Sequence, residues 1–185
     1  MTVGKRGTLI GVVVAGLTGT IDAQNRSVDW TQWRGPNRDG AVASFVEPKT
    51  WPAMLNRKWK VEVGLGYASP LVVGNRIYMF ARQGQDEVML ALDADSGKVL
   101  WRTGYPAPFK MNPAAAPHNE GPKSTPAFAN GKLYAIGMTG IVTAFNAADG
   151  KQLWQKPASK VATLYTTHSF SPVVERGDTA ISLTA

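Results

Sequence analysis

A sequence motif of twelve residues, called the repeated phrase below, occurs twice in this chain and limits the folds that the chain can adopt. The first copy runs from Leu90 to Trp101 (LALDADSGKVLW), and the second runs from Thr143 to Trp154 (TAFNAADGKQLW). A proline-containing apolar start precedes each copy, at Ser69–Tyr78 and Thr125–Tyr134, and a third start follows at Ser169–Val174. A repeat of this size, made of short alternating strands and Gly, Asn or Asp turns, is typical of propeller blades. We therefore expect an all-β fold, a β-propeller of four-stranded antiparallel blades.

The residues around the first copy predict one complete blade. We expect its four strands at Ala68–Val73, Arg76–Arg82, Val88–Leu92 and Val99–Arg102. Gly74-Asn75 is a hairpin signal, and the polar stretch Gln83–Glu87 is expected to be a loop. The second copy repeats this order, with Asn130-Gly131 as its hairpin and the tighter Met138–Gly140 in place of the polar loop. Four short strands in each repeat are the pattern of a propeller blade.

The repeats are too few to close a propeller by themselves. The chain supplies about two blades and the start of a third, so we expect an incomplete propeller and interpret the chain as an N-terminal fragment. The alternating stretch Asn56–Val63 is expected to be a strand of the closing blade. The expected division is a signal peptide at 1–23, an N-terminal segment with a Trp and Gly-Pro motif at 24–55, and a partial propeller at 56–185.

The first residues predict export. Lys5-Arg6 forms a short basic region, and the apolar stretch Thr8–Leu17 is too short to span a bilayer. Small residues follow, and cleavage is expected after Ala23. A buried first strand is the alternative interpretation of the apolar stretch. Export would make the mature chain periplasmic or secreted, and we expect no transmembrane span after cleavage.

Charge and cysteine content exclude several classes of function. The net charge of +7 falls to +6 after cleavage, because the removed segment holds two basic residues and one acidic residue. The basic residues are scattered rather than gathered in a stripe with exposed aromatics, so no nucleic-acid partner is expected. The chain contains no cysteine, which excludes disulfides, thiolate metal sites and a cysteine nucleophile.

The turn of the repeated phrase superficially suggests a calcium loop. Asp93–Gly97 carries two aspartates, but its counterpart Asn146–Gly150 has lost the second carboxylate. A turn in which Asp or Asn side chains bond the backbone explains both copies. Glycine recurs at Gly97 and Gly150, where a turn needs a positive φ. We predict no metal site and no catalytic residue.

Several motifs resemble the PQQ-like β-propeller repeat family. They are Trp33-Arg-Gly-Pro36, the paired strand starts with their proline, and the repeated phrases that end in tryptophan. The likeness runs from about Trp30 to the end of the sequence. The family includes quinoprotein alcohol dehydrogenases and an outer-membrane assembly scaffold. The resemblance implies that the tryptophan of each fourth strand docks one blade on the next; the structural residues are then Trp59, Trp101, Trp154, Gly97 and Gly150.

Polar residues without a counterpart in the other copy are the candidates for facing a ligand. They are Arg34, Arg38, His118, Lys123 and His168. His118 and Lys123 flank Glu120–Pro122 just before an inner strand, so they could face the central channel. The alternative is that these residues are loop residues bonded to nearby carbonyl groups.

Two functions compete at this point. The first is a binding or assembly scaffold in the cell envelope, whose partners would be envelope proteins or peptides, or the missing blades of the same propeller. The second, which the resemblance implies, is a fragment of a quinoprotein alcohol or sugar dehydrogenase with pyrroloquinoline quinone and calcium. The calcium ligands and the vicinal disulfide of that branch cannot be located here. We therefore expect a scaffold without a cofactor.

Overall fold

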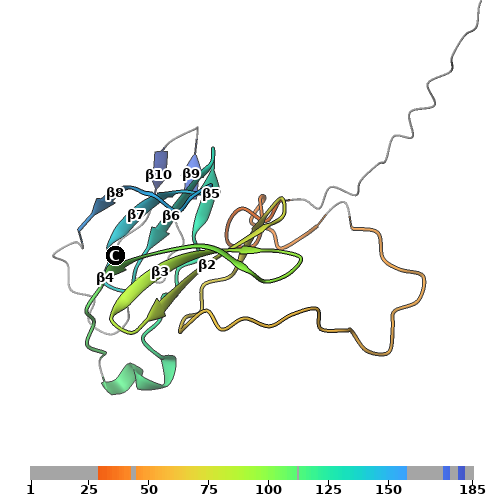
Figure 1. Cartoon of the computed structure of the whole chain (residues 1–185), viewed down its shortest axis with the longest axis horizontal. Helices are drawn as coiled ribbons and strands as arrows, with labels where there is room; N and C mark the ends of the chain where they lie inside the picture. Colours follow the sequence, from red (N-terminus) through yellow and green to blue (C-terminus); the bar gives the residue numbers. More distant parts are fainter. Residues whose placement is uncertain (1–28, 43–44, 112, 158–172, 176–178, 182–185) are drawn as a thin grey trace, which may run out of the picture.

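The computed structural model describes residues 29–42, 45–111, 113–157, 173–175 and 179–181. Two antiparallel sheets of four strands dominate it (Figure 1). The first sheet consists of β1 (Leu71–Val73), β2 (Arg76–Gln83), β3 (Asp86–Asp93) and β4 (Val99–Pro106). The second consists of β5 (Ala127–Ala129), β6 (Lys132–Ile136), β7 (Val142–Asn146) and β8 (Gln152–Lys156).

Each sheet has its strands in sequence order, as a propeller blade does. A third sheet pairs β9 (Val173–Glu175) with β10 (Thr179–Ile181), and β9 lies near β5. The loop between the two blades carries a short 3₁₀ helix, η1 (Pro113–His118). The predicted fold class is confirmed: the chain is an all-β, incomplete propeller of two four-stranded blades and the start of a third.

The hairpin signals are confirmed because they supply the backbone conformations that tight turns need. Gly74 and Asn75 form the turn between β1 and β2. Asn130 and Gly131 have φ of 48° and 71°, the pair of positive values that a type I′ turn requires. Gly97 and Gly150 have φ of 72° and 75° in the turn before each fourth strand.

The prediction of a polar loop at Gln83–Glu87 is wrong. Gly84 and Gln85 alone form a two-residue turn, and strand pairing continues on both sides, with Gln83 opposite Asp86 and Arg82 opposite Glu87. Polar side chains occupy these strand positions because Arg82 and Glu87 are paired with each other in the interior. The expected strand at Asn56–Val63 also differs, since no strand is assigned there.

Both blades carry the same β-bulge. Ala91 lies opposite Trp101 while Leu92 lies opposite Val99, so Leu100 is the extra residue of β4. The second blade repeats this shift, which leaves Leu153 as the extra residue of β8. A bulge bends a strand and redirects the side chains next to it. In each blade, the residue just after the bulge is the repeated tryptophan.

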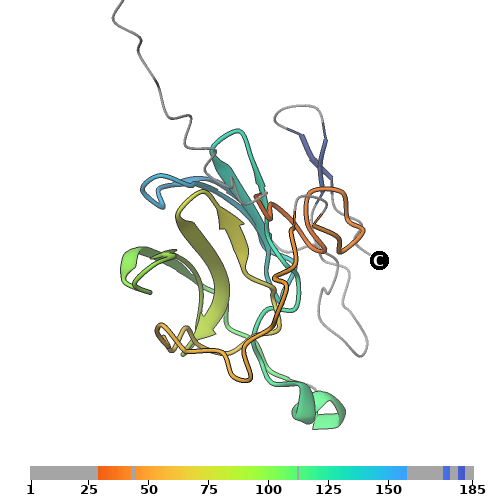
Figure 2. The same ribbon diagram turned by 90° about the vertical axis from the view of Figure 1, so that its right-hand side faces the viewer.

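The main core lies between the two blades. Figures 1 and 2 show the two sheets packed face to face. The buried cluster between them takes Leu71, Phe80 and Met89 from the first blade, with Leu133 and Phe145 from the second. On its other face, the first blade buries a smaller cluster against Val63. Both faces of β3 are therefore covered, which explains why six of its eight residues are buried.

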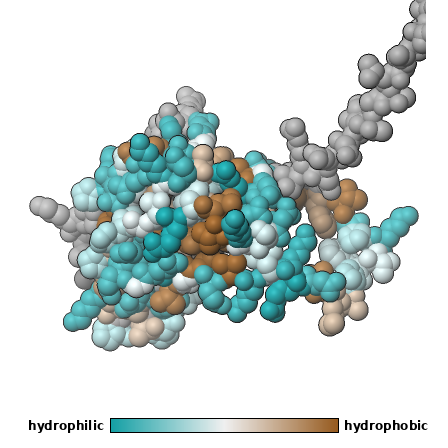
Figure 3. Space-filling model, viewed as in Figure 1, coloured by the Kyte–Doolittle hydropathy of each residue, from teal (hydrophilic) through white to brown (hydrophobic). Residues whose placement is uncertain are grey.

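The segment before the first blade ties the inner strands together. Trp30 and Val72 exchange both backbone hydrogen bonds, at 2.7 and 3.0 Å, and Thr31 O accepts the N–H of Phe128 at 2.7 Å. Further along, residues 41–42 and 45–57 project from the blades and expose large apolar side chains (Figures 1 and 3); these are Val42, Phe45, Val46, Trp51, Met54 and Leu55. Within the described ranges, no helix has the length and apolar character needed to cross a membrane.

Candidate functional site

The structure places the two predicted arginines in the loop of residues 30–40. Arg34 is exposed, has a φ of 61°, lies over the ring of Trp33 and donates to the carbonyl of Asp39. Arg38 is exposed too and has the same φ. Gly35 packs on Trp30, where an added Cβ would lie 2.7 Å from a ring carbon. The Trp-Arg-Gly-Pro motif therefore builds a tight loop on the inner strands.

Lys123 contacts His118, but at the backbone carbonyl of His118 rather than at its imidazole ring. The Lys123 ammonium donates to the carbonyl of His118 at 2.8 Å and lies 4.8 Å from the centre of the Tyr67 ring. Partial burial lowers the pKa of Lys123. This contact fits the alternative that loop residues bond nearby carbonyls. Figure 1 shows η1, at the end of which His118 lies, well apart from the loop that carries the arginines, and His168 lies outside the described residues.

The repeated tryptophans meet repeated glycines. Trp101 in the first blade donates its indole N–H to the carbonyl of Ala147 in the second, at 3.2 Å, and a Cβ at Gly150 would overlap the Trp101 ring. Trp59 makes the equivalent contacts one blade earlier, with the carbonyl of Ala94 at 3.1 Å and with Gly97. Each glycine thus serves both the positive φ and the close approach of an indole ring.

Trp154 occupies the same position in the second blade. It packs against Tyr134, with ring centroids 6.1 Å apart, as Trp101 packs against Tyr78 at 6.0 Å. It is nevertheless 39% exposed. Its docking role stays a prediction, because the turn that would receive it is not among the described residues.

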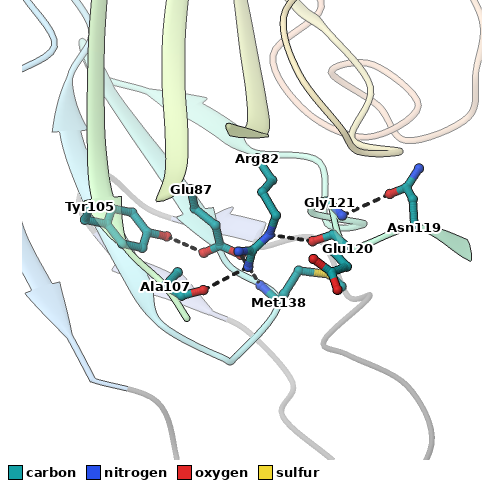
Figure 4. A network of polar contacts seen from close by, with 8 residues as sticks. All are labelled: Arg82, Glu87, Tyr105, Ala107, Asn119, Glu120, Gly121 and Met138. Carbon is teal, nitrogen blue, oxygen red and sulfur yellow. Dashed lines mark hydrogen bonds and ion pairs between the residues drawn. The ribbon is translucent and has the colours of Figure 1, made fainter. Parts of the chain in front are cut away.

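A buried ionic network joins the two blades and the loop between them (Figure 4). Arg82 and Glu87 are 2% and 0% exposed, and their charged groups lie 3.9 Å apart. The Glu87 carboxylate accepts the N–H of Met138 at 2.6 Å and the hydroxyl of Tyr105 at 2.9 Å. Gly137 lies so close that a Cβ there would overlap this carboxylate. Glu87 therefore connects the first blade to the β6–β7 turn of the second.

Arg82 binds both ends of the loop between the blades. Its guanidinium donates to Ala107 O at 2.9 Å and to Glu120 O at 2.6 Å, and it faces the ring of Phe109 at 6.0 Å (Figure 4). The third nitrogen, Nη1, is buried without a hydrogen-bond partner. A buried arginine that bonds two carbonyl groups thirteen residues apart fixes the path of this loop.

Burial dominates the electrostatics of this network. Desolvation raises the pKa of Glu87 above its ordinary value, although the Met138 N–H, Tyr105 and Arg82 all favour the charged form. Desolvation and the Glu87 charge also raise the pKa of Tyr105. Because every group of the network contacts another part of the fold, its arrangement supports the structure and presents no reactive group to solvent.

The described carboxylates do not gather into a calcium site. Calcium takes six or more oxygen ligands, several of them from carboxylates. In the ranges that the structure describes, no three His, Asp or Glu side chains come together as a metal site would require. Asp93 bonds the backbone and hydroxyl of Ser96, which hold its pKa below the usual range, and Asn146 makes the same kind of turn with Ala148.

One family accounts for nearly the whole chain. A sequence model of the family described as "Outer membrane protein assembly factor BamB" matches residues 19–185. The chain belongs to this PQQ-like repeat family. The two Trp–Gly contacts of the structure lie within the matched part, in both repeats. No protein with a curated description matches the chain.

Solved structures overlap this member of the PQQ-like repeat family in part. BamB from Moraxella catarrhalis has 17% identity and a TM-score of 0.40, over 60% of this chain and 30% of that one. A europium-containing methanol dehydrogenase has 22% identity and a TM-score of 0.38, over 60% of this chain and 19% of that one. A quinohemoprotein alcohol dehydrogenase from Comamonas testosteroni has 22% identity and a TM-score of 0.39, over 57% of this chain and 15% of that one. The chain spans less than a third of the length of these proteins.

Proposed function

We propose that this chain is part of an exported β-propeller that serves as a binding and assembly scaffold in the cell envelope. The observation that carries the proposal is the match of residues 19–185 to a family described as an outer membrane protein assembly factor. The predicted signal peptide supports a periplasmic or secreted location. The partners would be envelope proteins or peptides, and no resident quinone is part of the proposal.

The geometry supports binding at the outer edge of the second blade. All five residues of β8 are exposed, and β7 is its only neighbour among the described strands. The inner strands β1 and β5 have less free edge for a partner, because Trp30 pairs with β1 and Thr31 accepts a hydrogen bond from β5. An exposed edge strand can receive an extended segment of a partner through backbone hydrogen bonds. We therefore place the contact with partners at β8.

Four polar side chains that are bonded to other parts of the fold also favour binding over catalysis. Arg82, Glu87 and Tyr105 are buried and bonded to other parts of the fold. Lys123 is bonded to a loop carbonyl. A catalytic group needs access to its substrate, whereas a scaffold needs rigid blades with exposed edges.

Site-specific photocrosslinking in the organism that encodes the chain tests this proposal. A benzophenone amino acid at Lys156 in β8 is expected to give a discrete adduct that mass spectrometry identifies as an envelope protein. The same amino acid at Gln85, in the exposed turn between β2 and β3, is the matched control and should give no such adduct. Equal adducts at both positions, or adducts with cytoplasmic proteins alone, would contradict the proposal.

A further inference from the structure

Residues 41–42 and 45–57, called the projecting segment below, gather exposed apolar side chains away from the blades (Figures 1 and 3). The six large ones named above are between 45% and 83% exposed, whereas those that β4 and β8 expose reach at most 44%. Single exposed apolar residues are normal on a protein surface, but a contiguous group of them marks a site of interaction. The projecting segment is therefore a candidate contact surface.

Two aromatic rings of the projecting segment are held together at the surface. Phe45 and Trp51 stack with their ring centroids 6.2 Å apart and their planes at 25°, and both are 60% exposed. None of the six large apolar side chains belongs to the two cores that the described residues form. The stacked pair thus orders the segment without burying it, and its apolar faces stay open to another surface.

Basic residues surround these apolar side chains. Arg38 precedes the segment, Lys49 lies within it, and Arg57 and Lys58 come at its end; all four are exposed. Among the described residues, none of these four side chains makes a hydrogen bond or an ion pair. The acidic residues of 38–58 number two, at positions 39 and 47, which leaves a net charge of +2 (four minus two). The surface that the segment contacts should therefore be anionic.

The backbone of the projecting segment favours a lipid surface over a protein strand as its partner. Pro48 and Pro52 lack an N–H group, so the segment cannot join a sheet as a regular strand. No strand is assigned to residues 45–57. A bilayer surface needs no backbone pairing: it accepts apolar side chains at the boundary between headgroups and acyl chains, attracts cations, and favours tryptophan at this depth.

We propose that the projecting segment binds the surface of an anionic lipid bilayer. Its apolar side chains enter the boundary between headgroups and acyl chains, and its cations contact the lipid phosphates. The irregular backbone stays among the headgroups, where water can satisfy its polar groups. This inference goes beyond the proposed scaffold function and does not depend on it. Figure 1 shows β8 on the opposite side of the molecule, so binding through the projecting segment leaves the β8 edge free for a protein partner.

A fluorescent label at a single cysteine tests the proposal on the full chain. The chain contains no cysteine, so Leu55→Cys and Leu100→Cys each give one site for a nitrobenzoxadiazole label. Both leucines are exposed, and Leu100 lies in β4, outside the segment. On vesicles of phosphatidylglycerol and phosphatidylcholine in equal parts, the label at position 55 should brighten about twofold or more and shift to the blue, because its surroundings become less polar. The label at position 100 should keep the emission that it has in buffer.

The matched controls separate binding by the segment from general attraction. With the label at position 55, Lys49→Glu should weaken vesicle binding about tenfold or more, because it reverses a charge at the anionic surface. Lys110→Glu changes the net charge equally at an exposed position just before η1, which Figure 1 shows well apart from the segment, and should stay within about threefold. Vesicles of phosphatidylcholine alone should bind at least about tenfold more weakly. Circular dichroism verifies that each variant is folded.

Four results would overturn the proposal. They are no response of the label at position 55 to either vesicle, equal responses at positions 55 and 100, equal affinity for the two kinds of vesicle, and equal effects of Lys49→Glu and Lys110→Glu. Because the label reports its own surroundings, insertion of the apolar stretch Thr8–Leu17 alone would not reproduce the expected pattern. Brightening that depends on protein concentration and not on lipid would assign the segment to contact with a second copy of the chain and would also overturn the proposal.

Discussion

Replacing Trp101 with alanine will lower the free energy of unfolding of this chain by up to about 3–5 kcal/mol, the usual range for truncating a core aromatic, because its indole is partly buried between the blades. The indole lies against Tyr78 on its own blade, rests on Gly150 of the next blade and donates to the carbonyl of Ala147. Truncation removes the hydrogen bond and opens a cavity between the two blades. The surrounding strands cannot fill it without moving one blade toward the other.

Urea unfolding of the full chain, followed by far-UV circular dichroism, measures this effect. Gln85→Ala is the control, since Gln85 is exposed in a hairpin turn and uses only its carbonyl to bond Ala107. It should change the free energy of unfolding by no more than about 0.5 kcal/mol. The same unfolding midpoint for both variants would refute the docking role of Trp101.

Arg82→Met will also destabilise the chain by about 3–5 kcal/mol, because it leaves the buried Glu87 carboxylate without its ion pair. The change also frees the carbonyls of Ala107 and Glu120 at the two ends of the loop between the blades. Protease cleavage within residues 108–119 should therefore become faster, an effect that a general loss of stability alone would not confine to this loop.

Two variants separate the buried pair from an exposed one. Arg102→Met removes an exposed arginine that bonds Gln83, and it should cost less than about 1 kcal/mol. Adding Glu87→Gln to Arg82→Met removes the unpaired charge and should recover part of the lost stability. A double variant that is as unstable as the sum of the two single variants would show that Arg82 and Glu87 act independently.

The fold could be predicted from local signals because the sequence of each blade contains the residues that specify its turns. Asn130-Gly131 and Gly74-Asn75 specify two-residue hairpins, and the repeat then fixes which strand follows which. The bulges at Leu100 and Leu153 could not be predicted, since a bulge depends on how the redirected tryptophan meets the neighbouring blade. Asn56–Val63 alternates as a strand does, yet strand assignment needs a partner that the described residues do not supply.

The buried network was missed because its residues look like those of a polar loop. Arg82 and Glu87 are buried only when the loop between the blades and the β6–β7 turn cover them, and these contacts span up to 51 positions in sequence. A signal was present: the two opposite charges lie symmetrically about Gly84-Gln85, as cross-strand partners of a two-residue hairpin do. The candidates chosen for lacking a repeat, such as Arg34 and Lys123, lie instead in separate loops.

A titration with pyrroloquinoline quinone tests the central claim, a scaffold without a resident quinone, most directly. The full chain is titrated by calorimetry and by quinone absorbance, with and without calcium, and a dye-linked alcohol oxidation assay accompanies it. We predict no measurable binding and no turnover, because no three acidic or histidine side chains of the described residues gather as a calcium site would require. Micromolar binding that requires calcium, or any quinone-dependent turnover, would contradict the scaffold and identify an oxidoreductase.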